Sequence, residues 1–329
     1  MDKIPASAKA HREGGTDYGA NAVKYATARH GPDGAQFLDP VFLPKLEDLS
    51  GQNIIDIGCG AGPWAVYAAN HGAKVFGIDY QMGMLKNAKK AITEADVNDK
   101  VVLTNADGAA LPAANNEFSL ALSINVGCNL PNTFPTPQGE TKLPVGFNPH
   151  FTEMARVLEK GGRAIVTAPT SFGEVFTRGD KLETEVATAI QKELDEIGNS
   201  QDAAVIKSHL DKLDNVYRAT FAWRDDKWVL ITDESQLKSG ETIWRKLPGL
   251  TVPNFYHHEN EYIQAAEKAG LKVAEVHHKL FKTEFERERY NLSVLEEKQL
   301  GPEYSEEAGG KPPFVVYVFE KPLPISNNN

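Results

Sequence analysis

The segment Asp56–Trp64, with the sequence DIGCGAGPW, places three glycines within five positions directly after the apolar residues Ile54 and Ile55. Because glycine has no side chain and tolerates positive φ, a ligand can approach the backbone closely at such a turn. A helix that begins at Pro63 offers free N–H groups at its N-terminus to an anionic group. The segment therefore predicts a strand, a ligand-binding turn and a helix, in that order.

Strands and helices alternate on either side of a long central interruption. The apolar patterns predict strands at 53–57, 74–78, 101–105, 118–124, 164–167, 271–276 and 314–319, and helices at 63–70, 82–92, 149–158 and 261–269. The third of these helices is expected to stop at Gly161-Gly162, as a C-terminal glycine predicts. Alternating strands and helices favour a parallel sheet with both faces covered. We therefore expect an α/β fold with a doubly wound, mostly parallel seven-stranded sheet and helices on both faces.

The interruption, residues 171–255, reads as an insertion after the fifth strand. A four-residue repeat of apolar residues, from Leu182 to Leu194, predicts an amphipathic helix, and 204–217 predicts a second. The sequence FAWRDDKWVLI predicts a hairpin that turns at Asp225-Asp226. We divide the chain into an N-terminal segment (1–33), a core (34–170 and 256–322), an inserted α+β unit (171–255) and a tail (323–329).

Composition excludes several kinds of partner. The net charge of −10 and the lack of a Lys/Arg cluster argue against nucleic-acid binding. The first residues, MDKIPASAKAHREGG, lack the apolar core of a signal peptide, and no segment approaches the roughly 20 apolar residues of a membrane span. Two cysteines, Cys59 and Cys128, give no disulfide framework, and the absence of an H-x-x-x-H pair argues against a metal. We expect a cytoplasmic protein with no membrane segment, and the sequence does not indicate its oligomeric state.

The glycine turn distinguishes two classes of ligand. Dinucleotide-binding turns follow G-x-G-x-x-G, and here Pro63 occupies the sixth place after Gly58 and Gly60. The run Asp56–Gly62 instead resembles the D-x-G-x-G-x-G signature of class I, Rossmann-like S-adenosylmethionine-dependent methyltransferases of the small-molecule type. The sequence Glu153 to Gly162 is similar to the E-x-x-RVL-x-x-GG motif of that family.

The resemblance implies S-adenosylmethionine as the cofactor. In such families an acidic residue at the position of Asp79 binds the two ribose hydroxyls, and one at the position of Asp107 faces the adenine amino group. Each carboxylate has a purely local alternative, as a helix cap or a turn residue. The cofactor contacts that the resemblance implies are Asp56, Gly58, Cys59, Gly60, Gly62, Asp79, Tyr80, Met84, Ala106, Asp107, Gly108 and Asn125, with Tyr18 and Tyr25 from an N-terminal segment that folds over the cofactor.

The acceptor side is less defined, because methyl transfer from a sulfonium depends chiefly on in-line positioning and has no obligatory base. Ligands of open α/β sheets bind beyond the carboxyl ends of the strands, which selects Asn125, His150, Tyr256 and His257 as candidates. His150 has an alternative role beside its helix, and His257 has one in a solvated loop. The resemblance implies that the insertion is a lid, and the alternative for its aromatic residues is that they form a core of their own.

These features predict methyl transfer from S-adenosylmethionine to an O, N or S atom of a small metabolite. Phe118-Ser119 stands where the common small-molecule subgroup has Phe-Asp, which leaves the subfamily open. The alternatives are another adenosyl-sulfonium enzyme, such as an aminopropyltransferase, and a non-catalytic scaffold that retains the cofactor pocket. A nicotinamide oxidoreductase is disfavoured by Pro63.

Overall fold

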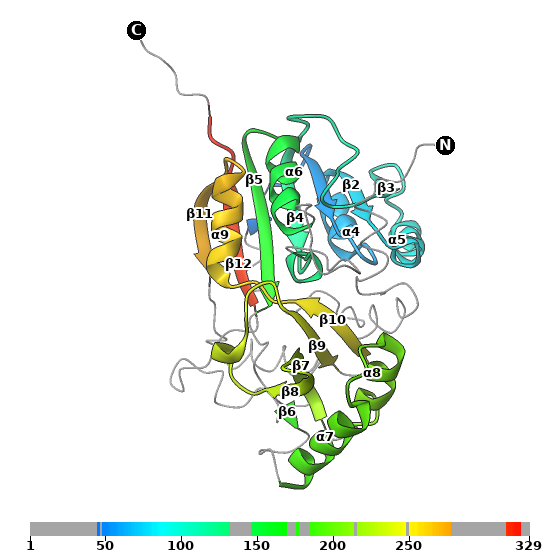
Figure 1. Ribbon diagram of the computed structural model, residues 1–329. Coiled ribbons are helices and arrows are strands. Elements are labelled where there is room, and N and C mark those ends of the chain that lie inside the picture. The colour runs from blue at the N-terminus through cyan, green and yellow to red at the C-terminus, as the bar shows by residue number, and fades with distance from the viewer. Residues whose placement is uncertain are drawn as a thin grey trace, which may run out of the picture.

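A computed structural model describes residues 45–46, 48–131, 146–169, 176–177, 184–213, 216–247, 250–277 and 314–323. Tyr18, Tyr25, the whole segment 1–33 and residues 324–329 lie outside these ranges. Figure 1 shows two parts, a large α/β unit and a smaller sheet with two helices beyond one end of it.

The large unit is built on a seven-stranded sheet. Its strands are β1 (Asn53–Ile57), β2 (Lys74–Asp79), β3 (Val101–Asn105), β4 (Phe118–Ile124), β5 (Leu158–Pro169), β11 (Lys272–His277) and β12 (Phe314–Glu320), in the order β11-β12-β5-β4-β1-β2-β3. β1 to β5 pair in parallel, and β12 runs antiparallel to both β5 and β11. The expected mostly parallel seven-stranded sheet is confirmed. The chain reverses its direction across the sheet between β1 and β4, which is where such folds bind ligands.

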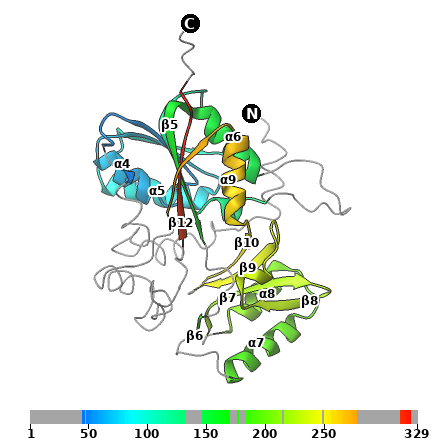
Figure 2. The same cartoon turned by 90° about the vertical axis from the view of Figure 1, so that its left-hand side faces the viewer.

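Helices cover both faces of this sheet. They are α4 (Pro63–Asn70), α5 (Met82–Glu94), α6 (Phe147–Val157) and α9 (Glu259–Lys268), with α4 and α5 on one face and α6 and α9 on the other (Figure 2). Neighbouring residues of β1 point to opposite faces: Ile54 packs with Trp64 of α4, and Ile55 packs with Phe151 of α6. All four of these side chains are buried. A strand buried on both faces explains the continuous apolar run before the glycine turn.

The junction of α6 and β5 differs from the expectation. α6 ends at Val157 and β5 begins directly at Leu158, so Gly161-Gly162 does not close the helix. The register against β4 moves from Phe118–Leu158 to Leu120–Arg163, and the extra residues form a bulge. Gly161 has φ 81°, and a Cβ at Gly162 would lie 2.9 Å from the carbonyl oxygen of Glu159. The two glycines therefore allow the strand to bulge. From the sequence alone, a glycine pair needed for a bulge looks the same as one that ends a helix.

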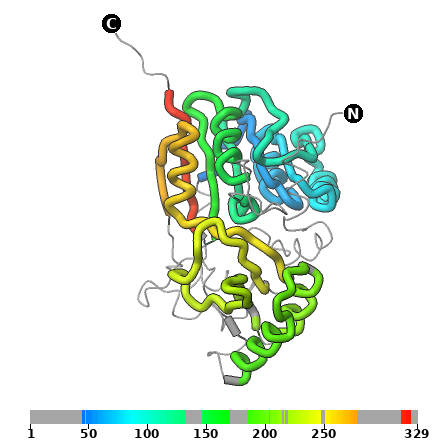
Figure 3. Tube along the Cα trace, viewed as in Figure 1, coloured from blue at the N-terminus to red at the C-terminus, as the bar shows by residue number. Residues whose placement is uncertain are grey.

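The smaller unit is an antiparallel sheet flanked by two helices. Its strands are β6 (Phe176–Thr177), β7 (Val216–Arg224), β8 (Lys227–Ile231), β9 (Thr242–Leu247) and β10 (Leu250–Phe255), in the order β10-β9-β7-β6 with β8 beside β7, and its helices are α7 (Thr184–Ile197) and α8 (Ala203–Leu210). The β7–β8 hairpin turns at Asp225 and Asp226, both with positive φ, as predicted. The predicted helix 204–217 is wrong beyond Leu210, because residues from Val216 on pair in the sheet. β9 and β10 were not predicted. Figure 3 shows the chain returning from β10 to α9 beside the main sheet.

The two faces of this inserted sheet pack against different parts of the molecule. Phe221, Trp228 and Trp244 form a core with α7 and α8, which agrees with the expectation that aromatic residues can build a core within the insertion itself. Ile243 lies on the opposite face, in a small cluster with Cys128 from the segment after β4. That second face is therefore the one turned to the main unit.

Candidate functional site

The glycine turn follows β1 as predicted. Gly58, Gly60 and Gly62 have φ of 69°, 57° and 82°, in the left-handed region that other residues rarely adopt. A Cβ at Gly58 would lie 2.6 Å from Cγ2 of Val126, so this turn touches the segment after β4. A Cβ at Gly60 would meet no atom of the described residues within 4 Å. The turn is therefore packed on one side and open on the other. Cys59, between the glycines, is buried and donates its backbone N–H to the carbonyl of Ile78.

Asp79, at the end of β2, is tied to this turn. Its carboxylate accepts the backbone N–H of Gly60 at 2.9 Å and that of Gln81 at 2.7 Å, one on each oxygen. Burial raises the pKa of Asp79, while these two donors lower it. A carboxylate has about four acceptor positions, so both oxygens retain capacity for a further donor. The local role and the ligand role of Asp79 are compatible.

Asp56 lies beneath the turn. It is buried and accepts the backbone N–H of Ala65 in the first turn of α4, while its Oδ2 has no hydrogen-bond partner among the residues that the structure describes. Burial first, and then the charge of Asp79, raise the pKa of Asp56 from 3.8 to about 7. This carboxyl group therefore holds a proton far more readily than a surface aspartate does.

Asp107 follows β3. Its Oδ1 accepts the N–H of Ala109 at 2.8 Å, as a turn-holding aspartate does, and its buried Oδ2 has no hydrogen-bond partner within the described part of the chain. A Cβ at Gly108 would lie 3.0 Å from Cγ2 of Ile57, so this loop packs closely against the end of β1. Ala106 donates its N–H to the carbonyl of Asp79, which aligns the ends of β2 and β3. Two other predicted contacts follow Asp79 in the chain: Tyr80 is half-buried, and Met84 is buried in α5.

His150 is fully enclosed. Its Nδ1 lies 3.0 Å from the carbonyl of Gly108, so it must carry the proton, and its Nε2 accepts from the hydroxyl of Ser123 at 2.8 Å. Burial lowers the pKa of His150. Both nitrogens are used within the protein, which favours the alternative that His150 fixes the loop after β3.

Asn125, the first residue after β4, has φ 57°. Its backbone N–H donates to Oγ1 of Thr167 at 2.9 Å, and its Oδ1 accepts the Thr167 hydroxyl at 3.1 Å. A non-glycine residue with positive φ is costly and often marks a functional segment. The remaining polar atom of its side chain, Nδ2, can donate to a ligand.

Tyr256 and His257 lie between β10 and α9. The Tyr256 hydroxyl bonds Glu234 and His258, and burial, followed by the charge of Glu234, raises its pKa. His257 stacks on Phe147 and donates from Nε2 to the carbonyl of Leu130 at 2.7 Å. Burial lowers the pKa of His257, so the ring is neutral and its Nδ1 is unprotonated; among the described residues that buried atom has no hydrogen-bond partner. His257 is not in a solvated loop.

Glu153 and Arg156, the charged residues of the E-x-x-RVL-x-x-GG motif, form an ion pair. The guanidinium bonds both oxygens of Glu153 at 2.7 and 2.8 Å and also the carbonyls of Leu111 and Ala113. Glu153 in turn accepts the N–H of Leu111 at 2.7 Å. The pair fastens α6 to the loop that begins with Asp107.

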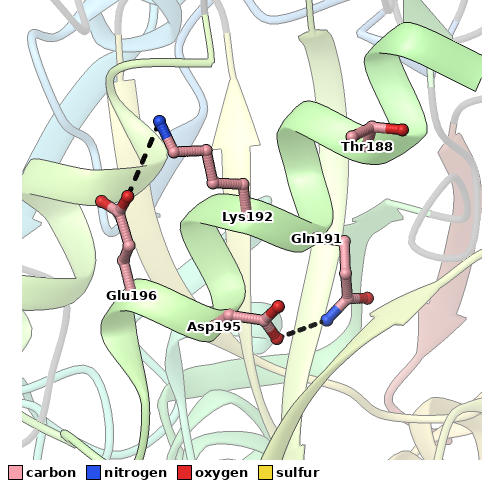
Figure 4. Close-up of a pocket in the computed structure, with 5 residues that line it drawn as sticks. All are labelled: Thr188, Gln191, Lys192, Asp195 and Glu196. Atoms are coloured by element: carbon pink, nitrogen blue, oxygen red, sulfur yellow. Dashed lines mark hydrogen bonds and ion pairs between the residues drawn. The ribbon is translucent and has the colours of Figure 1, made fainter.

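A second group of ionisable residues was not predicted from the sequence, because its members come from two different helices of the insertion, α7 and α8. Ligand atoms of Glu193, Glu196 and His209 lie within 4.8 Å of one another. The ammonium of Lys212 lies 3.3 Å from Glu193 and 3.2 Å from His209, so a cation of the chain itself already occupies this group. An open depression of about 480 Å³ on the outer side of α7 adjoins it, lined by Thr188, Gln191, Lys192, Asp195 and Glu196 (Figure 4). None of these residues belongs to the loops after β1, β2 or β3.

No helix in the ranges that the structure describes is both long and apolar enough to cross a bilayer.

Part of the chain is similar in sequence to known methyltransferases. Residues 54–140 match the methyltransferase domain family. A demethylmenaquinone methyltransferase of Lactiplantibacillus plantarum is 29% identical over 126 residues, which cover 37% of this chain and 47% of the relative. Methyltransferase GfsG of Streptomyces halstedii is 28% identical over 147 residues, which cover 44% and 45%. The chain thus spans about half the length of the curated relatives it matches.

A solved structure shares the fold over most of both chains. An S-adenosylmethionine-dependent methyltransferase from Mesorhizobium loti superposes with a TM-score of 0.51 at 18% identity, covering 88% of this chain and all of that one (100%). Residues 54–140 of this chain therefore match the methyltransferase domain family, and the chain has the fold of an S-adenosylmethionine-dependent methyltransferase.

Proposed function

We propose that the protein transfers a methyl group from S-adenosylmethionine to an O, N or S atom of a small metabolite. The observation that carries this proposal is the set of carboxylates at the ends of β1, β2 and β3, arranged around a glycine turn that is open on one side. The relatives support it, since their names are those of methyltransferases, and demethylmenaquinone is a small organic molecule.

The residues present fit this cofactor. Asp79 keeps acceptor capacity on both oxygens for the two ribose hydroxyls, and the unpartnered Oδ2 of Asp107 can accept from the adenine amino group. The open side of Gly60 leaves room for the body of the ligand. When bound, S-adenosylmethionine supplies a methyl group already activated on a positively charged sulfur.

The chain's own contribution is then mainly positioning. Correct alignment of acceptor and methyl can supply roughly 7–11 kcal/mol of the barrier. Asn125 can orient the reactants through its amide N–H₂ group, while the unprotonated Nδ1 of His257 and the hydroxyl of Tyr256 are the acceptor-side groups proposed to bind the acceptor. A base is needed only if the acceptor loses a proton, and His150 is not proposed for that role because both its nitrogens are bonded.

The inserted unit is proposed to be a lid, and the enzyme to work in the cytoplasm. The insertion follows the carboxyl end of β5 and lies beyond that end of the sheet (Figure 1), and β1, which leads into the glycine turn, runs in the same direction as β4 and β5. A cover there would exclude water from the charged sulfur. Both cysteines are buried free thiols, as in a reducing compartment.

Titration calorimetry with S-adenosylmethionine and with NAD tests the cofactor, and incubation with methyl-labelled S-adenosylmethionine and fractionated cell metabolites tests the transfer. We expect binding of the sulfonium compound only, and label in a small-molecule fraction. Binding of NAD alone would overturn the assignment. Binding without transfer would favour a scaffold, and transfer of an aminopropyl group would favour the other sulfonium chemistry.

Replacing Asp79 by alanine is expected to weaken S-adenosylmethionine binding by about 1–3 kcal/mol, because a buried pair of hydroxyl contacts is lost. Calorimetry of the purified variant measures the change. Asp99→Ala, at an exposed turn before β3, is the matched control and should bind as the wild type does. Equal affinity of the Asp79 variant and the wild type would mean that Asp79 does not hold the ribose.

A further inference from the structure

A chain of hydrogen bonds connects the inserted sheet to the carboxyl end of β4. Asn254 of β10 donates from Nδ2 to Oδ1 of Asn129 at 2.8 Å. Asn129, in the short helix η2 (Gly127–Asn129), donates from its own Nδ2 to the carbonyl of Asn125 at 3.0 Å. Asn125 is joined in turn to Thr167 of β5 by two hydrogen bonds. Asn254 and Thr167 are both fully buried, at 1% and 0% exposure.

The hydrogen bonds from Asn254 to Asn129 and from Asn129 to Asn125 run in one fixed direction, from the inserted sheet toward Asn125. The carbonyl of Asn125 can only accept, so the amide nitrogen of Asn129 must face it. The oxygen of Asn129 then faces Asn254, which must present its nitrogen. Each amide orientation therefore determines the next, and the donor that begins the series belongs to the insertion.

Asn125 needs such support. Its φ of 57° lies in a region that costs a non-glycine residue free energy, and it persists only where the surroundings hold it. The same carbonyl that accepts from Asn129 also accepts from the thiol of Cys128 at 3.4 Å. Cys128 itself packs against Ile243 of the inserted sheet, so two contacts of the insertion converge on one peptide group.

We infer that Asn254 is a positioning residue for methyl transfer: acting through Asn129, it holds Asn125 in place at the carboxyl end of β4, an inference that rests on the proposed function. The insertion then does more than cover the site. It sets the backbone of Asn125, the residue proposed to orient the reactants, so the inserted sheet and the alignment of the reaction are coupled.

The test uses the full chain with Asn254→Ala and Asn254→Asp. The alanine variant removes the donor, and the aspartate variant keeps the shape but places an acceptor against the oxygen of Asn129. The matched control is Thr251→Val on the same strand, since Thr251 is also buried and also makes one inter-element hydrogen bond, to Asp211 at 2.6 Å next to α8. That bond lies away from Asn129.

The first readout does not depend on the acceptor. Amide hydrogen exchange at Asn125, followed by NMR, is expected to rise about tenfold or more in both Asn254 variants and to stay within about twofold of the wild type in Thr251→Val. The second readout is the initial rate of label transfer from methyl-labelled S-adenosylmethionine, at saturating donor, to the metabolite fraction that the wild type methylates. That rate is expected to fall roughly tenfold to a hundredfold, while the affinity for the donor changes less than about threefold.

A double variant tests whether Asn254 acts through Asn129. Because Asn254 acts through Asn129, Asn129→Ala combined with Asn254→Ala should cost no more in rate than Asn129→Ala alone. Unchanged exchange at Asn125 in the Asn254 variants would overturn the inference, and so would increased exchange with an unchanged transfer rate. If the wild type transfers no label, both the proposed function and the role of Asn254 in catalysis are overturned. Faster exchange at Asn125 in the Asn254 variants would in that case still show that the hydrogen bonds from Asn254 hold Asn125, so the two failures can be distinguished.

Discussion

Gly58→Ala is expected to lower the free energy of unfolding by about 2–5 kcal/mol. One part, about 1–2 kcal/mol, comes from placing a Cβ on a residue with positive φ. Another part, about 1–3 kcal/mol, comes from overpacking, because that Cβ would lie 2.6 Å from the Val126 side chain, which is branched and stiff. Denaturant unfolding of the purified variant measures the sum.

Gly60→Ala is the matched control for this prediction. Gly60 also has positive φ, 57°, but a Cβ there would meet none of the described atoms within 4 Å, so only the first cost of about 1–2 kcal/mol applies. In a Val126→Ala background the cost of Gly58→Ala should fall to that same value. Equal costs for the two glycines in the wild-type background would show that the turn does not press against the segment after β4.

Asp56→Asn is expected to stabilise the protein at neutral pH and above relative to the wild type, with little difference near pH 4. The folded-state pKa of Asp56 is raised from 3.8 to about 7, so between these values the folded protein keeps a proton that the unfolded chain loses. The contribution of Asp56 to stability is therefore fully present below 3.8 and is lost as the pH rises through about 7. At about 1.36 kcal/mol per unit the loss amounts to at most about 4 kcal/mol. Asparagine resembles the protonated carboxyl group and stays uncharged at every pH, so the variant does not lose this stability as the pH rises.

Denaturant unfolding of both proteins across this pH range tests the prediction. His150 acts in the opposite direction, since burial lowers its pKa and stability then falls as the pH decreases below the ordinary histidine value. Both proteins contain His150, so their difference removes its contribution. A difference in unfolding free energy that does not grow between about pH 4 and pH 8 would show that Asp56 ionises freely in the folded protein.

Several features could be predicted because they depend on neighbours in the sequence. β1, α4, β3 and β4 were predicted with the boundaries that the structure has, since a doubly buried strand needs an unbroken apolar run and a helix of this fold begins after its glycine turn. The hairpin at Asp225-Asp226 is likewise local, because the turn needs two residues that accept positive φ.

Other features depend on partners far away in the chain. Val216 continues an amphipathic pattern that suits a helix, yet it pairs in β7, because the strands beside it offer a sheet. Gly161-Gly162 reads as a helix stop, and only the pairing of β5 with both β4 and β12 turns it into a bulge. The environment of His150 was equally open, since its two hydrogen-bond partners lie 27 and 42 positions away.

The sequence by itself determined the α/β alternation, the glycine turn and the acidic residues at the ends of the first three strands, because each follows from backbone preferences and periodicity within about a dozen residues. Only the tertiary structure decided which face of the inserted sheet meets the main unit and that Asn254 reaches Asn125 through Asn129. Those amides are separated by 125 positions in the chain, and a hydrogen bond forms only where folding brings its donor and acceptor within about 3 Å of each other.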